Sequence, residues 1–188
     1  MPWKALGVST PREPTSEPAP KRRLASPWER PDTEFPAVVP VGTMPFDTAG
    51  PTAVAVTGML AYRNGFEFFF TRLVRPDRLV PRPPNPSGFL RAEETFKLGV
   101  EFAGGRPTFP GDHIERRYDD EPSQPFLFPG GRSVRGYRED ARWWVWPLPP
   151  PGQLKFICSL GETTTQVSMD AHLILDASQR SIQVWSDA

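Results

Sequence analysis

The chain has 188 residues, equal numbers of basic and acidic side chains at 22 each, 25 prolines and 15 glycines. Its length predicts one domain with extensions, and its balanced charge disfavours a protein that binds nucleic acid by neutralising phosphates. The proline and glycine content favours short strands and many turns over a helical bundle. A single cysteine, Cys158, excludes an intramolecular disulfide and a cysteine-based structural metal site.

No basic segment followed by an apolar run opens the sequence, and no apolar run approaches the length of a membrane span. We therefore expect a cytoplasmic protein with no membrane segment. Nothing in the pattern calls for a cofactor.

Residues 1–35 are rich in proline, polar and charged side chains, without an apolar period. Such a composition predicts a disordered tail, followed by one folded domain over residues 36–188. Trp3 and Trp28 stand out in this tail, because a tryptophan left in water wastes a large contact. We expect them to be docking anchors, on a partner or back on the domain.

The domain is predicted to open with an edge strand over residues 36–41, which has proline at either side. A hairpin over residues 51–76 follows, in which Asn64-Gly65 predicts a two-residue type I′ turn. Such a loop fixes the register. It pairs Arg63 with Phe66, Tyr62 with Glu67, Leu60 with Phe69, Met59 with Phe70 and Val56 with Leu73.

This hairpin has two apolar faces, whereas one layer of a sandwich covers only one of them. One face carries Tyr62 and Phe69, and the second face carries Phe66, Phe68 and Phe70. We expect the second face to be covered either by a C-terminal helix and Trp185 or by another chain.

Residues 95–102 alternate apolar and polar side chains, which is typical of a strand buried on one face. Residues 107–109 could start a short return strand. Residues 110–136 then form a long loop rich in polar residues, proline and glycine, interrupted by Phe126-Leu127-Phe128.

A strand over residues 142–147 places Trp143 and Val145 on one side and Trp144 and Trp146 on the other. A stiff proline bridge follows it. Further strands are predicted over residues 154–160 and 164–169.

Asp170 can cap a helix, because its carboxylate can accept from the open amides of the first turn. Leu173, Ile174 and Ala177 follow at helical spacing. The sequence favours this helix over the alternative, a hairpin across residues 176–180.

The segment Trp144-Val-Trp-Pro-Leu-Pro-Pro-Pro-Gly152, with Asp170-Ala171 and the terminal Val184-Trp185, resembles a family of uncharacterised actinobacterial β-rich proteins. The resemblance covers roughly residues 36–188. The family has no established activity, so the resemblance implies a related architecture and no catalytic residues.

The densest polar cluster lies in residues 112–121. Its carboxylates could ligate a hard cation, with His113 as general base or ligand, although interleaved arginines would neutralise the site and the spacing matches no EF-hand loop. The candidate ligands are Asp112, Glu115, Asp119 and Asp120.

Other reactive side chains favour structural roles. His113 and His172 are far apart in sequence and belong to no zinc motif, and Cys158 falls on the inward side of its strand. Gly104-Gly105 and Gly130-Gly131 resemble phosphate-binding turns, but neither follows a strand and opens a helix, so both predict ordinary turns.

We therefore predict a mainly β fold: an antiparallel sandwich of about seven or eight strands, with one short C-terminal helix. The expected function is a non-enzymatic binding or protein-interaction module. Its aromatic surface would contact a protein partner or a second copy, and could also stack on a small molecule or a glycan. The candidate contacts are Phe66, Phe68, Phe70, Trp144, Trp146, Trp3 and Trp28.

Two alternatives remain open at this point. One is a small hydrolase or cation-dependent enzyme that uses the acidic loop over residues 112–121. The other is a structural subunit that forms a homo-oligomer through the same aromatic surface.

Overall fold

The computed structural model describes residues 26–48, 50–75, 96–111 and 125–185. These residues form eleven strands and one short helix, a mainly β fold as the sequence predicts. Four strands have only two residues: β1 (Glu34–Phe35), β2 (Ala37–Val38), β3 (Met44–Pro45) and β11 (Ile182–Gln183). The other seven have six residues or more, and they carry the architecture.

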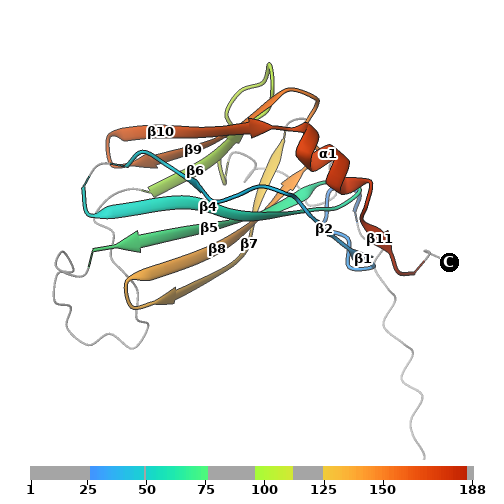
Figure 1. Cartoon of the computed structure of the whole chain (residues 1–188), viewed down its shortest axis with the longest axis horizontal. Coiled ribbons are helices and arrows are strands. Elements are labelled where there is room, and N and C mark those ends of the chain that lie inside the picture. Colours follow the sequence, from blue (N-terminus) through green and yellow to red (C-terminus); the bar gives the residue numbers. More distant parts are fainter. Residues whose placement is uncertain (1–25, 49, 76–95, 112–124, 186–188) are drawn as a thin grey trace, which may run out of the picture.

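Two antiparallel sheets pack face to face (Figure 1). The larger sheet has the order β2-β4-β5-β8-β7, with β3 also paired to β4. It is built on β4 (Thr52–Ala61), β5 (Phe66–Val74), β7 (Phe126–Arg135) and β8 (Arg138–Trp146). The smaller sheet, β10-β9-β6, contains β6 (Phe96–Glu101), β9 (Gln153–Leu160) and β10 (Thr163–Asp170).

Aromatic side chains join the two sheets. The rings of Phe68 on β5 and Phe156 on β9 lie 5.0 Å apart, as do those of Phe70 on β5 and Phe96 on β6. Phe66, Phe68 and Phe70 are fully buried, and burying each contributes about 2–3 kcal/mol. Strand β5 therefore lies opposite β6 and β9, and this opposition fixes which part of the larger sheet is covered.

The helix α1 (His172–Ser178) closes one end of the sandwich (Figure 1), and Ile174 and Ala177 bury in the core. Asp170 accepts a hydrogen bond from the backbone amide of His172 at 2.9 Å, as expected for an acceptor before a first turn. The predicted helix is confirmed, and the alternative hairpin is wrong. No helix among the residues described is long and apolar enough to cross a membrane.

The predicted hairpin forms, but its turn and register differ from the prediction. Ala61 pairs with Phe66, so the loop has four residues, closed by a bond from the Tyr62 amide to the Gly65 carbonyl oxygen at 2.9 Å. Neither Asn64 nor Gly65 has a positive φ, so the turn is not type I′. A bulge between Val56 and Gly58 shifts the register again.

Gly65 is needed for a different reason. A Cβ atom there would lie 2.4 Å from the carbonyl oxygen of Val145 and 2.7 Å from the ring of Trp144. The turn therefore packs directly on β8. Glycine is required at this position because the two backbones approach closely, and not because the turn needs a positive φ.

The segment predicted as a loop over residues 110–136 contains a ten-residue strand, β7, paired antiparallel with β8. The sequence does not show the alternation expected of this strand, because it contains Pro129, Gly130 and Gly131 and its register shifts between Pro129 and Gly131. Residues 112–124 of the predicted loop lie outside the described residues.

Other strand predictions hold with changed bounds: β8, β9 and β10 are longer than predicted, and β6 is shorter. The alternation of β6 buries Leu98 and Val100, and Val100 forms a single bridge with Thr108 in place of the expected return strand. The first strand of the domain shrinks to β2, at the edge of the larger sheet as predicted.

The predicted boundary at residue 35 is too late, because residues 26–35 pack on the domain. β1 pairs with β11, and Asn64 donates to the carbonyl oxygens of Pro27 at 2.7 Å and of Glu29 at 2.9 Å. A partly buried tryptophan and hydrogen bonds to main-chain carbonyl oxygens compensate here for a composition that is typical of disorder. The earlier part of the predicted tail, residues 1–25, lies outside the described residues.

Candidate functional site

The larger sheet is wider than the smaller one. Because β5 faces β6 and β9, the inner face of β8 and β7 is covered less completely: Val145 and Leu127 are buried in the core, whereas Ala141 and Trp143 are only partly buried. A cleft of about 900 Å³ lies there, between the inner face of β7–β8 and the edge strand β6. Its lining comprises Arg72, Phe96, Lys97, Leu98, Phe109, Pro110, Pro129, Gly131, Arg132, Glu139, Ala141, Arg142, Trp143 and Ser159.

Strand alternation brings an arginine and a glutamate to the same inner face. On β5 the inward positions Phe66, Phe68 and Phe70 lead to Arg72, and on β8 the inward Val145 and Trp143 lead back to Glu139. Arg72 and Glu139 are direct cross-strand partners. Both side chains are about 5% exposed, so the pair is buried in the cleft wall.

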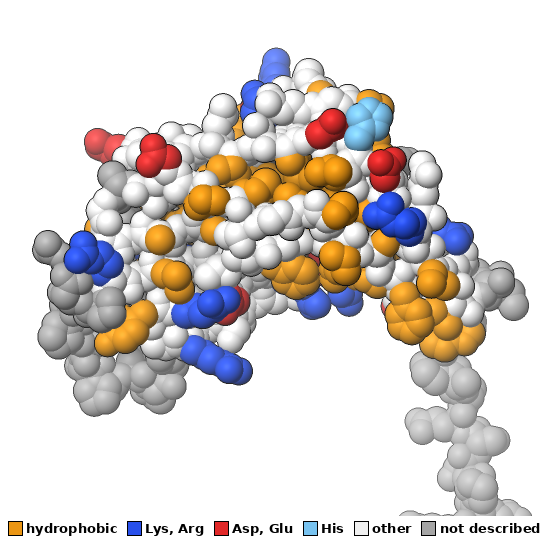
Figure 2. Space-filling view, viewed as in Figure 1, with side chains coloured by type: hydrophobic (Ala, Val, Ile, Leu, Met, Phe, Trp, Pro, Cys, Tyr) orange, Lys and Arg blue, Asp and Glu red, His pale blue; other side chains and the backbone are white. Residues whose placement is uncertain are grey.

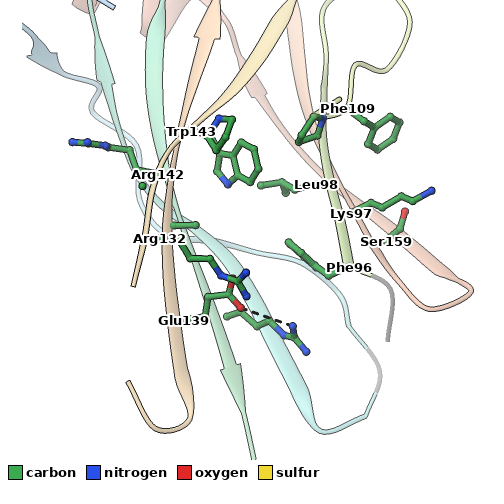
Figure 3. A pocket seen from close by; sticks show the side chains of 14 residues that line it. Phe96, Lys97, Leu98, Phe109, Arg132, Glu139, Arg142, Trp143 and Ser159 are labelled. Carbon is green, nitrogen blue, oxygen red and sulfur yellow. Dashed lines mark ion pairs between the residues drawn. The ribbon is translucent and has the colours of Figure 1, made fainter. Parts of the chain in front are cut away.

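Glu139 lies between two guanidinium groups. Its Oε1 atom is 2.7 Å from Arg132 Nε, whereas its Oε2 atom is 3.9 Å from Arg72 Nη1, too long for a hydrogen bond (Figure 3). Within the part of the chain that the structure describes, three buried polar atoms of this wall lack a hydrogen-bond partner: Arg72 Nε, Glu139 Oε2 and Trp143 Nε1. Buried polar atoms without partners are uncommon and mark places where a ligand or water binds.

The remaining walls are apolar. Trp143 from the larger sheet and Leu98 from the smaller sheet point toward each other (Figure 3). The guanidinium carbon of Arg72 lies 5.8 Å from the centre of the Phe96 ring, within range of a cation–π contact. The lining continues around β6 to the cross-strand pair Lys97 and Ser159 at the rim. The cleft thus joins a charged inner end to an aromatic wall.

The three phenylalanines predicted as partner contacts are core residues. Phe66, Phe68 and Phe70 are almost wholly inaccessible and face the smaller sheet. The expectation that they form a binding surface is wrong, because the hairpin turns this face inward and its other face outward.

The predicted contacts Trp144 and Trp146 lie on the outer face of the larger sheet, where the chain's own N-terminal segment meets them. We call this segment, residues 26–31, the strap. Trp144 Nε1 donates to the carbonyl oxygen of Trp28 at 2.8 Å, and the Trp28 and Trp146 rings meet edge to face at 6.4 Å. Trp28 therefore docks on its own domain, one of the two roles expected of it. Trp3 lies outside the described residues.

The strap also supplies a counter-ion to a buried carboxylate. Glu67 Oε1 lies 3.2 Å from Arg30 of the strap and 3.4 Å from Arg142, and Tyr62 donates its hydroxyl to Glu67 Oε2 at 3.0 Å. Burial, and then the charge of Glu67, raise the pKa of Tyr62 to about 12. The hairpin face that carries Tyr62 is therefore covered in part by the strap. The second face, with Phe66, Phe68 and Phe70, packs in one core with the smaller sheet and α1, whereas Trp185 is exposed and does not cover it.

Cys158 behaves as a core residue. Its side chain is buried, and loss of hydration raises the pKa of the thiol to about 11. This thiol stays protonated and enclosed at neutral pH, which agrees with its predicted structural role.

The predicted acidic loop is not covered by the structure. Asp112, His113, Glu115, Asp119 and Asp120 lie outside the described residues, so the cation-dependent alternative stays a prediction. Within the residues that are described, no three His, Cys, Asp or Glu side chains gather closely enough to hold a metal ion. His172 is exposed in the first turn of α1.

Exposed apolar side chains gather elsewhere. Phe35 and Ile182 face each other across the β1–β11 ribbon and are 64% and 63% exposed. Val184, whose amide bonds to the Thr33 carbonyl oxygen, continues the same ribbon face. Figure 2 shows hydrophobic side chains gathered at this end of the molecule.

Sequence reasoning missed Arg72, Arg132 and Glu139. A signal for two of them was present: the inward alternation of β5 and of β8 reaches Arg72 and Glu139 two positions beyond the apolar residues. An arginine and a glutamate that extend two buried faces predict a cross-strand pair. Arg132 had no such signal, because its strand was taken for a loop.

No protein-family model matches the sequence, and comparisons with curated proteins and with solved structures return no significant match. The functional argument therefore depends on the geometry of this chain alone.

Proposed function

We propose that this protein is a non-enzymatic binding module and that its ligand binds in the cleft between β6 and the inner face of β7–β8. One observation carries this proposal: a cleft of about 900 Å³ lies beside Arg72, Glu139 and Trp143. Each of these three residues has a buried polar atom without a hydrogen-bond partner among the described residues. Ligand sites are typically concave, mostly apolar, of this size and equipped with a few polar groups.

The polar groups of the cleft are arranged for binding rather than for proton or group transfer. Glu139 is held by Arg132 through its Oε1 atom at 2.7 Å, and its Oε2 atom faces Arg72 in the buried wall. At the rim, Ser159 shares a hydrogen bond with Thr164 at 2.9 Å. Cys158, the neighbour of Ser159, is a buried and protonated thiol. These contacts favour a recognition role.

A fragment screen followed by NMR tests this proposal. The Trp143 indole N–H resonance, assigned with Trp143→Phe, should shift when a fragment enters the cleft, because that N–H lies in the cleft wall without a partner among the described residues. Ala141→Trp should abolish the shift by filling the cleft, whereas Ala53→Trp, at an exposed site on β4, should leave it unchanged. Failure of a diverse library to shift this resonance in the wild type would overturn the proposal.

A second candidate is self-association or protein docking through the β1–β11 ribbon, favoured by the exposed Phe35–Ile182 pair. Apolar side chains grouped on an exposed strand edge commonly mark an interface. Sedimentation velocity of the wild type should then show a dimer that Phe35→Asp converts to monomer. Leu73→Asp, at an exposed site on β5, is the matched control. A wild-type protein that sediments as a monomer at high micromolar concentration would contradict self-association.

A further inference from the structure

The charges inside the cleft do not cancel. Arg72 and Arg132 share one carboxylate, Glu139, so this wall carries one positive charge in excess. Lys97 adds another at the rim. The fourth basic residue of the lining, Arg142, is engaged elsewhere: it donates to the Gly130 carbonyl oxygen at 2.9 Å and lies beside Glu67 on the outer face.

Arg72 is the decisive member of this group. Its side chain is only about 5% exposed, its Nε atom lacks a partner within the described residues, and Glu139 is 3.9 Å away. The guanidinium is therefore ion-paired but not hydrogen-bonded by Glu139. A buried arginine presents five donors in a planar fork, and a buried donor without an acceptor costs about 1–3 kcal/mol. A bound anion would remove that cost.

We propose that the cleft takes a ligand with a single carboxylate head and a flat apolar body, an inference that rests on the proposed function. The carboxylate is bound by the guanidinium groups of Arg72 and Arg132, and the body lies between Trp143 and Leu98. The single excess positive charge of the inner wall, Arg72 and Arg132 against Glu139, matches a monoanion. A carboxylate also fits the planar fork of an arginine in a bidentate manner, which gives geometry as well as charge.

The shape of the cleft supports a flat body. Trp143 and Leu98 face each other from the two sheets (Figure 3). Phe96 lies beside the guanidinium of Arg72. Gly99 on β6 brings a further ring close, because a Cβ atom there would lie 2.7 Å from the ring of Phe109. Aromatic and branched walls on both sides favour a planar or narrow ligand that they can contact on two faces.

Four probes with one common body test the inference: 2-naphthoate, 2-naphthalenemethanol, 2-naphthylmethylamine and 2-naphthyl phosphate. Titrations followed at the Trp143 indole resonance give the dissociation constants for the full chain. We expect naphthoate to bind at least about tenfold more tightly than the alcohol and the amine, because only the carboxylate forms charge-assisted hydrogen bonds with the guanidinium groups. The phosphate, whose second charge is not matched by the inner wall of Arg72, Arg132 and Glu139, should bind more weakly than naphthoate.

Two variants assign the preference to the arginines. Arg132→Met changes a side chain that is 54% exposed, so the fold should tolerate it, and it should weaken naphthoate binding about tenfold while leaving the alcohol unchanged. Arg72→Met should have the same effect if the protein folds. Arg180→Met removes one positive charge at an exposed site after α1 and should change neither affinity.

The outcomes separate the two proposals. Equal affinities for naphthoate, alcohol and amine, or an Arg132→Met variant that keeps the preference, would overturn the carboxylate inference and leave the cleft as a binding site. Tighter binding of the phosphate would replace the carboxylate with a phosphorylated ligand. The proposed function itself fails only if neither these probes nor any member of the fragment library shifts the Trp143 indole resonance.

Discussion

Trp144 donates a hydrogen bond from its indole nitrogen to the main-chain carbonyl oxygen of Trp28, 2.8 Å away and 116 positions earlier in the chain. This bond fastens the strap to the outer face of the larger sheet. Together with the Arg30–Glu67 ion pair, it makes residues 26–31 part of the domain and covers a tryptophan that would otherwise face water.

Trp28→Ala should therefore destabilise the domain by about 1–2 kcal/mol, less than a fully buried tryptophan because the side chain is only half-buried. Urea denaturation followed by circular dichroism measures the change. Trp185→Ala is the matched control: that side chain is 65% exposed, and its loss should change stability by less than about 0.5 kcal/mol. Equal effects of the two substitutions would show that the strap does not contribute to folding.

Tyr62 should titrate well above the ordinary tyrosine pKa of about 10. Burial and the Glu67 carboxylate raise its pKa from 10 to about 12, so absorbance at 295 nm should contain a late step that Tyr62→Phe removes. Glu67→Gln should move that step back toward pH 10. A wild-type titration complete by pH 10.5 would contradict this arrangement.

The same shift makes stability depend on alkaline pH. Because the unfolded tyrosine ionises near pH 10 while the folded one stays protonated up to about 12, the unfolded state loses its proton first. The contribution of Tyr62 to the free energy of unfolding is thus fully present below pH 10 and falls as the pH rises to about 12. Tyr62→Phe should flatten this part of the stability profile.

Gly65→Ala tests the close approach of the hairpin turn to β8. The added methyl group would lie 2.4 Å from the Val145 carbonyl oxygen, and the backbone cannot move aside as a flexible side chain could. We expect a loss of about 1–3 kcal/mol in thermal or urea unfolding. Gly42→Ala is the control, because no atom lies within 4 Å of its added Cβ and the substitution should be neutral or slightly stabilising.

The sequence predicted elements whose signal is local. The helix after Asp170, the alternation of residues 96–101 and the two-sided strand with Trp143 and Val145 opposite Trp144 and Trp146 all depend on spacing within a few residues. Each appears in the structure, and so does the mainly β architecture that they imply together.

The candidate site depends on long-range features that no local pattern contains. The cleft exists because β7 extends the larger sheet beyond β6, and β7 contains a proline and two glycines that are typical of a loop. The hairpin register failed for a similar reason. The Asn64-Gly65 pair predicts a turn conformation, whereas the observed turn is selected by packing against Trp144 and Val145. Tertiary contacts overrode local preference at both places.

Cys158 should resist thiol reagents until the domain unfolds. Its pKa of about 11, against an ordinary value of 9.0, lowers the thiolate fraction at neutral pH about a hundredfold, and the buried side chain also denies access. Ellman's reagent should therefore release less than a tenth of an equivalent from the native protein in an hour. In 6 M guanidinium chloride it should release one equivalent, because the chain has one cysteine. Rapid reaction of the native protein would mean that the core around β9, the central strand of the smaller sheet, opens. In that case the thiol would have to be reconsidered as a reactive group beside the cleft.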